Sequence, residues 1–169
     1  GGWPSGALNW MGLLDVFGFE IFESNSFEQL MVNLANEKLQ RFFLDAIFSF
    51  EQNLYQREEI TWVPVEVPDN SASIAAIEGR PDGVLPLLDE QCRLGERGTD
   101  VAFAEFLNER NGSCKAAIGA LDQRMRARFS AKRGFILNHF VCPVEYAAAD
   151  FLEKNRDTFY GDLAMQLAS

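Results

Sequence analysis

Two carboxylates and a glycine lie close together near the start of the chain: Asp15, Gly18 and Glu20. Asp15 directly follows the apolar run 10–14, which has the length and composition of a strand buried on both faces. An acid at the carboxyl end of such a strand is where open α/β sheets bind ligands, and it can help to hold Mg²⁺ beside a phosphate. Gly18 lets the backbone approach a ligand and offer its N–H, and Glu20 adds a second carboxylate. The residues alone equally support an ordinary turn, capped by Asp15 and bent at Gly18, with a solvated Glu20.

A long helix is expected to position these groups. Ser26 and Gln29 have the capping-box spacing, and neither Gly nor Pro occurs from residue 26 to residue 57. Apolar residues recur at helical spacing through this range. About 31 residues at roughly 1.5 Å each form a rod of about 45 Å, long enough to carry a displacement across a domain. We expect most of its aromatic residues to lie in the core, namely Phe27, Phe42, Phe43 and Phe50.

Several sequence blocks, in the same order, resemble the motor domain of myosins. DVFGFE (15–20), NSFEQL (25–30) and NEKLQ (36–40) closely resemble switch II and the relay helix of that family. Later blocks resemble the start of its relay loop, the start of its actin-binding helix-loop-helix and a further family segment: EITW (59–62), GVLPLLDEQCR (83–93) and FLEKNRD (151–157). The D-x-x-G-F-E form and the NSFEQ run are not those of kinesins, so a kinesin-like origin is disfavoured.

The resemblance implies an α/β fold, as a mainly helical fragment of a P-loop NTPase motor core. Its parts would be a central-sheet strand, a long relay helix and an actin-binding helix-loop-helix. We predict that residues 1–169 form one partial motor domain. Its expected divisions are strand and switch II (7–25), relay helix (26–57), relay loop and connector (58–82), helix-loop-helix (83–125), and a basic loop, strand and final helix (126–169).

The resemblance also implies roles for individual residues. Asp15 would contact Mg²⁺ through water, Gly18 would donate its N–H to the γ-phosphate of ATP, and Glu20 would help to position the attacking water. Trp62 would contact the converter. The candidate actin-binding residues are Arg93, Leu94, Arg97, Lys132 and Arg133. The residues alone leave open an ordinary helical hairpin at 83–125, a solvated basic loop after it, and a local core role for Trp62.

No G-x-x-x-x-G-K-[ST] phosphate loop and no segment resembling switch I occurs in these 169 residues. We therefore expect ATP and Mg²⁺ to act in the parent motor and not to bind tightly to this chain alone, which leaves its own enzymatic activity open. The main hypothesis is a segment of an actin-based, ATP-driven cytoskeletal motor, with filamentous actin and the rest of the myosin heavy chain as partners. The alternatives are a truncated actin-binding module and a non-functional remnant, both without ATPase activity.

Charge and composition restrict the partners further. Residues 1–110 carry 19 acids and 7 bases, a net charge of −12, whereas residues 111–169 carry 6 acids and 8 bases. This balance argues against nucleic acid as a partner of the whole chain. No apolar stretch reaches the roughly 20 residues of a membrane span. Three widely spaced cysteines favour free thiols in the cytoplasm, and the resemblance places the protein on the cytoskeleton in a myosin complex.

The remaining expectations concern local structure. We predict short helices at 73–77 and 84–91, a helix starting at Thr99 or Asp100, and another at 162–168. Residues 135–146 form an alternating, strand-like run in which Pro143 would disturb the strand. His139, the only histidine, has no acid or nucleophile spaced near it, so a structural role is expected. Residues Val101, Phe103, Ala104, Phe106 and Leu107 are expected to face inward.

Overall fold

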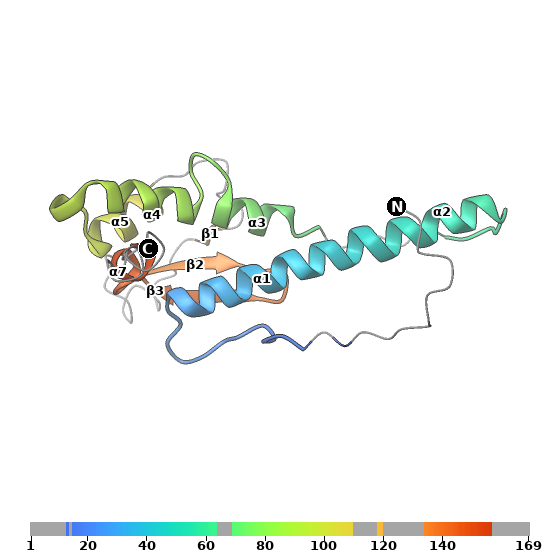
Figure 1. Cartoon of the computed structure of the whole chain (residues 1–169), viewed down its shortest axis with the longest axis horizontal. Coiled ribbons are helices and arrows are strands. Elements are labelled where there is room, and N and C mark those ends of the chain that lie inside the picture. Colours follow the sequence, from blue (N-terminus) through green and yellow to red (C-terminus); the bar gives the residue numbers. More distant parts are fainter. Residues whose placement is uncertain (1–12, 14, 64–68, 110–117, 120–133, 157–169) are drawn as a thin grey trace, which may run out of the picture.

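The fold is mainly helical, with a small antiparallel sheet beside the helices (Figure 1). The computed structural model describes residues 13, 15–63, 69–109, 118–119 and 134–156. In chain order the elements are α1 (Phe27–Phe43), the π-helical segment η1 (Leu44–Phe48), α2 (Ser49–Arg57), α3 (Ser71–Glu78), α4 (Val84–Arg93), the 3-10 turn η2 (Gly95–Arg97), α5 (Asp100–Glu109), β1 (Ile118–Gly119), β2 (Gly134–Asn138), β3 (Pro143–Ala147) and α7 (Phe151–Asn155).

The long helix begins where the capping box predicts. Ser26 is the N-cap residue, and its backbone N–H donates to Oε1 of Gln29 at 3.0 Å. Helical structure then continues through residue 57, but not as one regular α-helix, because the π-helical segment η1 separates α1 from α2. A π-turn inserts one residue into the helical repeat, and hydrophobic periodicity does not reveal it.

Burial along this helix corrects one expectation. The inner face of α1 is buried at Leu30, Leu34 and two polar residues described below, and Phe27 packs partly against the core. Phe42 and Phe50, however, are 71% and 66% exposed, and Phe43 is also exposed. The prediction that they are core residues is wrong, because α2 and the end of α1 extend beyond the other described elements (Figure 1).

Residues 134–147 form a hairpin of two strands, which corrects the prediction of one strand-like run. Strand β2 pairs antiparallel with β3, with Ile136 opposite Glu145 and Asn138 opposite Pro143. The two-residue strand β1 pairs with the other edge of β2. Pro143 is the first residue of β3, where its missing N–H does not interrupt the ladder, so it begins a strand and does not break one.

The helix predicted at 84–91 is confirmed as α4, the helix predicted to start at Thr99 or Asp100 as α5, and the helix predicted at 73–77 as α3. Phe103, Ala104 and Leu107 are buried and Phe106 is partly buried, but Val101 is exposed, contrary to expectation. An aromatic cluster joins α5 and α7 to the hairpin. It comprises Phe103, Phe135, Tyr146 and Phe151, with ring centroids 5.5 to 6.1 Å apart.

The expected central-sheet strand at residues 10–14 is described only at Leu13. That residue is 95% exposed and belongs to no strand. The other residues of this stretch lie outside the described part of the chain, and Leu13 does not pair with the sheet of β1, β2 and β3. The basic loop after residue 119 and the helix expected at 162–168 lie outside the described residues.

Candidate functional site

The segment 15–20 runs on the outside of the body, below α1 in Figure 1. Asp15, Phe17 and Gly18 are exposed, whereas Phe19 and Glu20 are half-buried. A Cβ atom placed on Gly18 would meet nothing within 4 Å, so the backbone there is open to an approaching molecule. The three predicted switch residues therefore lie together on one accessible stretch, although no described contact joins their side chains to one another.

Two asparagines of α1 hold this segment by its backbone. Asn36 donates through Nδ2 to the carbonyl oxygen of Phe17 at 3.0 Å. Asn33 pairs with both backbone groups of Glu20: its Oδ1 accepts from the N–H at 2.8 Å, and its Nδ2 donates to the C=O at 2.9 Å. These bonds attach main-chain atoms at two positions of the segment to α1.

A buried polar network lies behind Asn33. Its Nδ2 also donates to the hydroxyl of Tyr146 at 2.8 Å, and that hydroxyl lies 2.8 Å from Nε2 of His139. Nδ1 of His139 lies 2.9 Å from Oε1 of Glu37. The network thus connects α1, the hairpin and the segment 15–20. The side chains of both Glu37 and His139 are fully buried.

The carboxylate of Glu37 is buried without a lysine or arginine partner among the described residues. It is stabilised by hydrogen bonds: Oε1 also accepts from the N–H of Phe140 at 2.9 Å, and Oε2 accepts from Nδ2 of Asn70 at 2.7 Å. Burial raises the pKa of the Tyr146 hydroxyl above its ordinary value, so this group remains a protonated donor.

Sequence reasoning missed this network because its members are far apart in the chain. No acid lies near His139 in the sequence pattern, but in the structure His139 contacts Glu37, which is 102 positions away in the chain. A usable signal was the polar character of Asn33 and Glu37, which share the helical spacing of the buried Leu30 and Leu34. Polar residues at core positions of a helix need buried partners.

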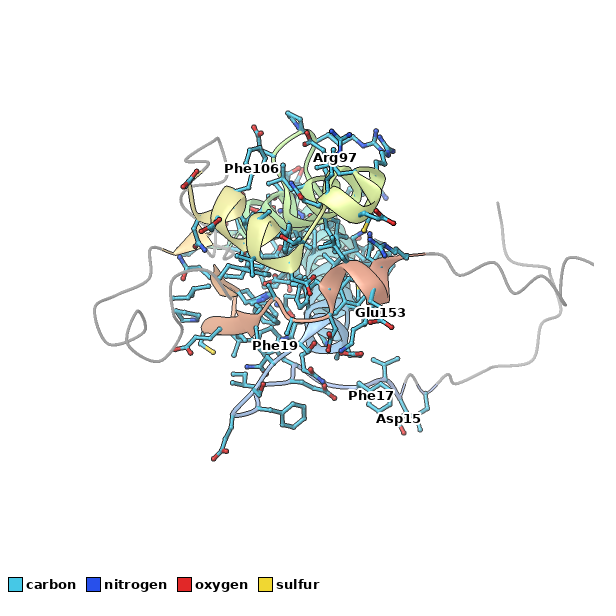
Figure 2. The ribbon with its side chains drawn as sticks, turned by 90° about the vertical axis from the view of Figure 1, so that its left-hand side faces the viewer. Asp15, Phe17, Phe19, Arg97, Phe106 and Glu153 are labelled. Atoms are coloured by element: carbon cyan, nitrogen blue, oxygen red, sulfur yellow. The ribbon has the colours of Figure 1, made fainter. Side chains whose placement is uncertain are left out.

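The candidate filament-binding tip lies between α4 and α5. Arg93, Leu94 and Arg97 are all exposed there, and Leu94 retains 40% of its accessible surface. Gly95 adopts a φ of +60°, a left-handed conformation that glycine accepts readily. Figure 2 shows Arg97 on the opposite side of the body from Asp15 and Phe17, so the tip and the segment 15–20 form separate surfaces.

Two further groups of predicted site residues have different outcomes. Trp62 is half-buried, and its ring lies 5.9 Å from that of Tyr55 on α2, so it packs locally at the end of the long helix. Lys132 and Arg133 lie outside the described residues.

The groups present fit part of a magnesium–nucleotide site. Asp15 offers an exposed carboxylate, a ligand type that Mg²⁺ prefers, and Gly18 offers an unobstructed backbone. Within the described part of the chain, no three His, Cys, Asp or Glu residues gather as a metal site.

Comparison with known proteins identifies the family. A family model described as the myosin head (motor domain) matches residues 5–169. The chain is 43% identical to unconventional myosin-Vb of Mus musculus over 152 residues, 41% identical to the myosin IA heavy chain of Dictyostelium discoideum over 153, and 40% identical to unconventional myosin-Va of Gallus gallus over 161. These alignments cover 90%, 90% and 95% of this chain. The chain belongs to the myosin head family.

The same alignments show how much of a myosin the chain represents. It spans 8% of the two unconventional myosins and 15% of the Dictyostelium protein. In the part of the chain that the structure describes, no helix has the length and apolar character needed to cross a bilayer.

Proposed function

We propose that this chain is the part of an actin-based, ATP-driven motor in which segment 15–20 senses the γ-phosphate and the helix at 27–57 passes its movement on. Membership of the myosin head family supports this proposal, as do the asparagine contacts from α1. The parent would act on the cytoskeleton in the cytoplasm, assembled with the rest of its heavy chain.

The observation that carries the proposal is the hydrogen bond from Asn36 to the carbonyl oxygen of Phe17. That carbonyl and the N–H of Gly18 belong to one planar peptide unit and point in opposite directions. α1 therefore holds one side of the peptide while the other side is free to donate to an anionic ligand. Any shift of this peptide toward a phosphate pulls on Asn36 and hence on α1.

The other two residues would act beside that peptide. Asp15 would hold the hydrated Mg²⁺, and the half-buried Glu20 would help to orient the attacking water. Bound Mg²⁺ would neutralise charge on the phosphates, while the protein supplies positioning and charge stabilisation. Trp62 follows the end of α2 and would contact the converter, so that the movement of the helix reaches the converter through it.

Filament binding would use the tip between α4 and α5. An exposed apolar side chain between two exposed arginines suits a protein surface with acidic groups, and actin is the proposed partner. Leu94 would supply the apolar contact, and Arg93 and Arg97 would steer the approach. Lys132 and Arg133 are proposed to add to this attraction.

The test is ATP turnover and actin pelleting by the intact protein that carries this chain. We expect actin-activated turnover, and we expect Asn36→Ala to lower kcat by about 10-fold to 100-fold, because misplacement of a catalytic segment is costly. Asn53→Ala, the same change at an exposed position of α2, is the matched control and should stay within about twofold.

Equal effects of the two substitutions would contradict the proposed coupling. Actin pelleting without any ATP turnover would favour the alternative, a filament-binding module without ATPase activity. Absence of both activities would refute the motor function and favour a non-functional remnant.

A further inference from the structure

We propose that His139 is a positioning residue, which fixes the backbone of Glu20 through Tyr146 and Asn33. Its effect on catalysis rests on the motor function proposed above, whereas its effect on the Glu20 backbone does not. The hydrogens that each buried group can donate determine how these residues are connected.

The count begins at Asn33. Its amide nitrogen has two hydrogens, and both are used: one is donated to the Glu20 carbonyl at 2.9 Å and the other to the Tyr146 hydroxyl at 2.8 Å. Its oxygen accepts from the Glu20 N–H. The orientation of this amide is thus fixed, because turning it over would set N–H against N–H and oxygen against oxygen.

The next member is Tyr146. Its oxygen already accepts from Asn33, so its own hydrogen is directed to Nε2 of His139 at 2.8 Å. Nε2 must then be the unprotonated ring nitrogen, and the proton of a neutral imidazole lies on Nδ1. Nδ1–H donates to Oε1 of Glu37 at 2.9 Å, where a carboxylate accepts it.

A protonated ring would not satisfy the same groups. An Nε2–H would point at an oxygen that already accepts from Asn33, and the Tyr146 hydrogen would lack an acceptor among the described residues. With a neutral His139, every donor from Glu37 to Glu20 has an acceptor. Donation runs in one direction, from Asn33 through Tyr146 and His139 to Glu37.

Packing supports the same connection. The ring of Phe19, the residue before Glu20, meets the His139 ring edge-to-face with centroids 5.1 Å apart. Segment 15–20 therefore contacts His139 directly through Phe19 and indirectly through the hydrogen bonds at Glu20. His139 acts on Glu20 through other residues and is not itself a catalytic residue.

Two substitutions of His139 test the hydrogen bonds of the two ring nitrogens one at a time. His139→Gln places an amide near the position of Nε2, where its oxygen can still accept from Tyr146. His139→Asn places an amide near Nδ1, where it can donate to Glu37 but leaves Tyr146 without an acceptor. Both variants lose the ring contact with Phe19, so their difference reports which of the two hydrogen bonds, to Tyr146 or to Glu37, affects Glu20. Tyr146→Phe removes the hydroxyl and keeps the aromatic packing.

The matched control is Ser73→Ala. Ser73 on α3 is buried and donates through Oγ to the carbonyl of Asn138 on the same hairpin at 2.8 Å. This change removes a hydrogen bond that holds the hairpin but has no part in the network. It tests whether any weakening of the hairpin is sufficient to affect Glu20.

The experiment measures hydrogen exchange of the Glu20 amide in the intact protein, together with single-turnover ATP hydrolysis and nucleotide affinity. We expect Tyr146→Phe and His139→Asn to speed exchange at Glu20 by about tenfold, because the bond from Asn33 to residue 146 is lost in the first and weakened in the second, where the Tyr146 hydrogen has no acceptor. His139→Gln and Ser73→Ala should remain within about twofold of the parent. Hydrolysis should slow in the same two variants, with nucleotide affinity unchanged.

The proposal is overturned if exchange at Glu20 is the same in His139→Asn and His139→Gln, or if Ser73→Ala speeds it as much as Tyr146→Phe does. The comparison of the two His139 variants can test the proposal even if Tyr146→Phe fails to fold. A parent protein that hydrolyses no ATP but shows the expected exchange pattern would refute the motor function and support the positioning of Glu20 by His139.

Discussion

Replacing Glu37 by glutamine should destabilise the protein far more than its small change in shape suggests. The carboxylate is fully buried and accepts from three N–H groups, those of His139, Phe140 and Asn70. Glutamine keeps one acceptor oxygen, which suits the two donors at Oε1, and presents an NH₂ group to Asn70. That donor–donor pair costs about 1–3 kcal/mol, and the loss of charge from the remaining bonds adds roughly 1 kcal/mol.

We therefore expect Glu37→Gln to lower the free energy of unfolding by about 2–4 kcal/mol. Hydrogen exchange of α1 and of the hairpin, measured on the intact protein, gives the local value. Glu28→Gln is the matched control: it is the same substitution on the same helix, but Glu28 is exposed and pairs with Lys154 at the surface, so its cost should stay below about 1 kcal/mol. Equal costs for the two substitutions would refute the assignment of Glu37 as a buried acceptor of three hydrogen bonds.

Three further predictions concern other parts of the chain. Gly98→Ala should lower the stability by about 1–3 kcal/mol, because its Cβ would lie 2.0 Å from the carbonyl oxygen of Gln91; an unchanged Tm would contradict this. Gly18→Ala should change stability by less than about 0.5 kcal/mol, since its Cβ meets no neighbour. It should nevertheless reduce ATP turnover in the intact protein, and full turnover would argue against a ligand at Gly18. The hydrogen bond from Lys154 lowers the pKa of Glu28 in the folded protein. The pair therefore stabilises the fold at pH values above the pKa that Glu28 has in the unfolded chain. This stabilisation is lost as the pH falls through the lower pKa of the folded state. Lys154→Met should therefore reduce stability at neutral pH by less than about 1 kcal/mol, and by less in strong acid, where the bond from Nζ to Oγ of Ser26 remains; an equal loss at both pH values would contradict the linkage.

Local signals in the sequence predicted the start of the long helix and the helices around the tip. Ser26 and Gln29 are three positions apart, and the bonds that define a capping box form within that span. The same local information failed for the hairpin, where alternation continues on both sides of a turn that precedes Pro143. It also failed for the exposed Phe42 and Phe50, because a helical pattern identifies an apolar face but not what covers it.

The polar network behind the segment 15–20 was beyond such local reasoning. Glu37 and His139 meet only after the hairpin docks against α1, and no spacing rule links positions 102 residues apart. The role of Asn33 likewise depends on Tyr146, which lies 113 positions away. The candidate residues Asp15, Gly18 and Glu20 could be selected from their spacing, whereas the groups that hold Glu20 in place required the tertiary structure.

The central claim is that α1 transmits the state of the segment 15–20 along the helix. The most direct measurement is hydrogen exchange of the intact protein with and without a non-hydrolysable ATP analogue. The proposed function predicts that nucleotide changes exchange both at residues 15–20 and in α2, and that Asn36→Ala weakens the change in α2 while leaving the one at 15–20. A protein that binds the analogue but shows no change in α2, or the same change with Asn36→Ala, would contradict the claim.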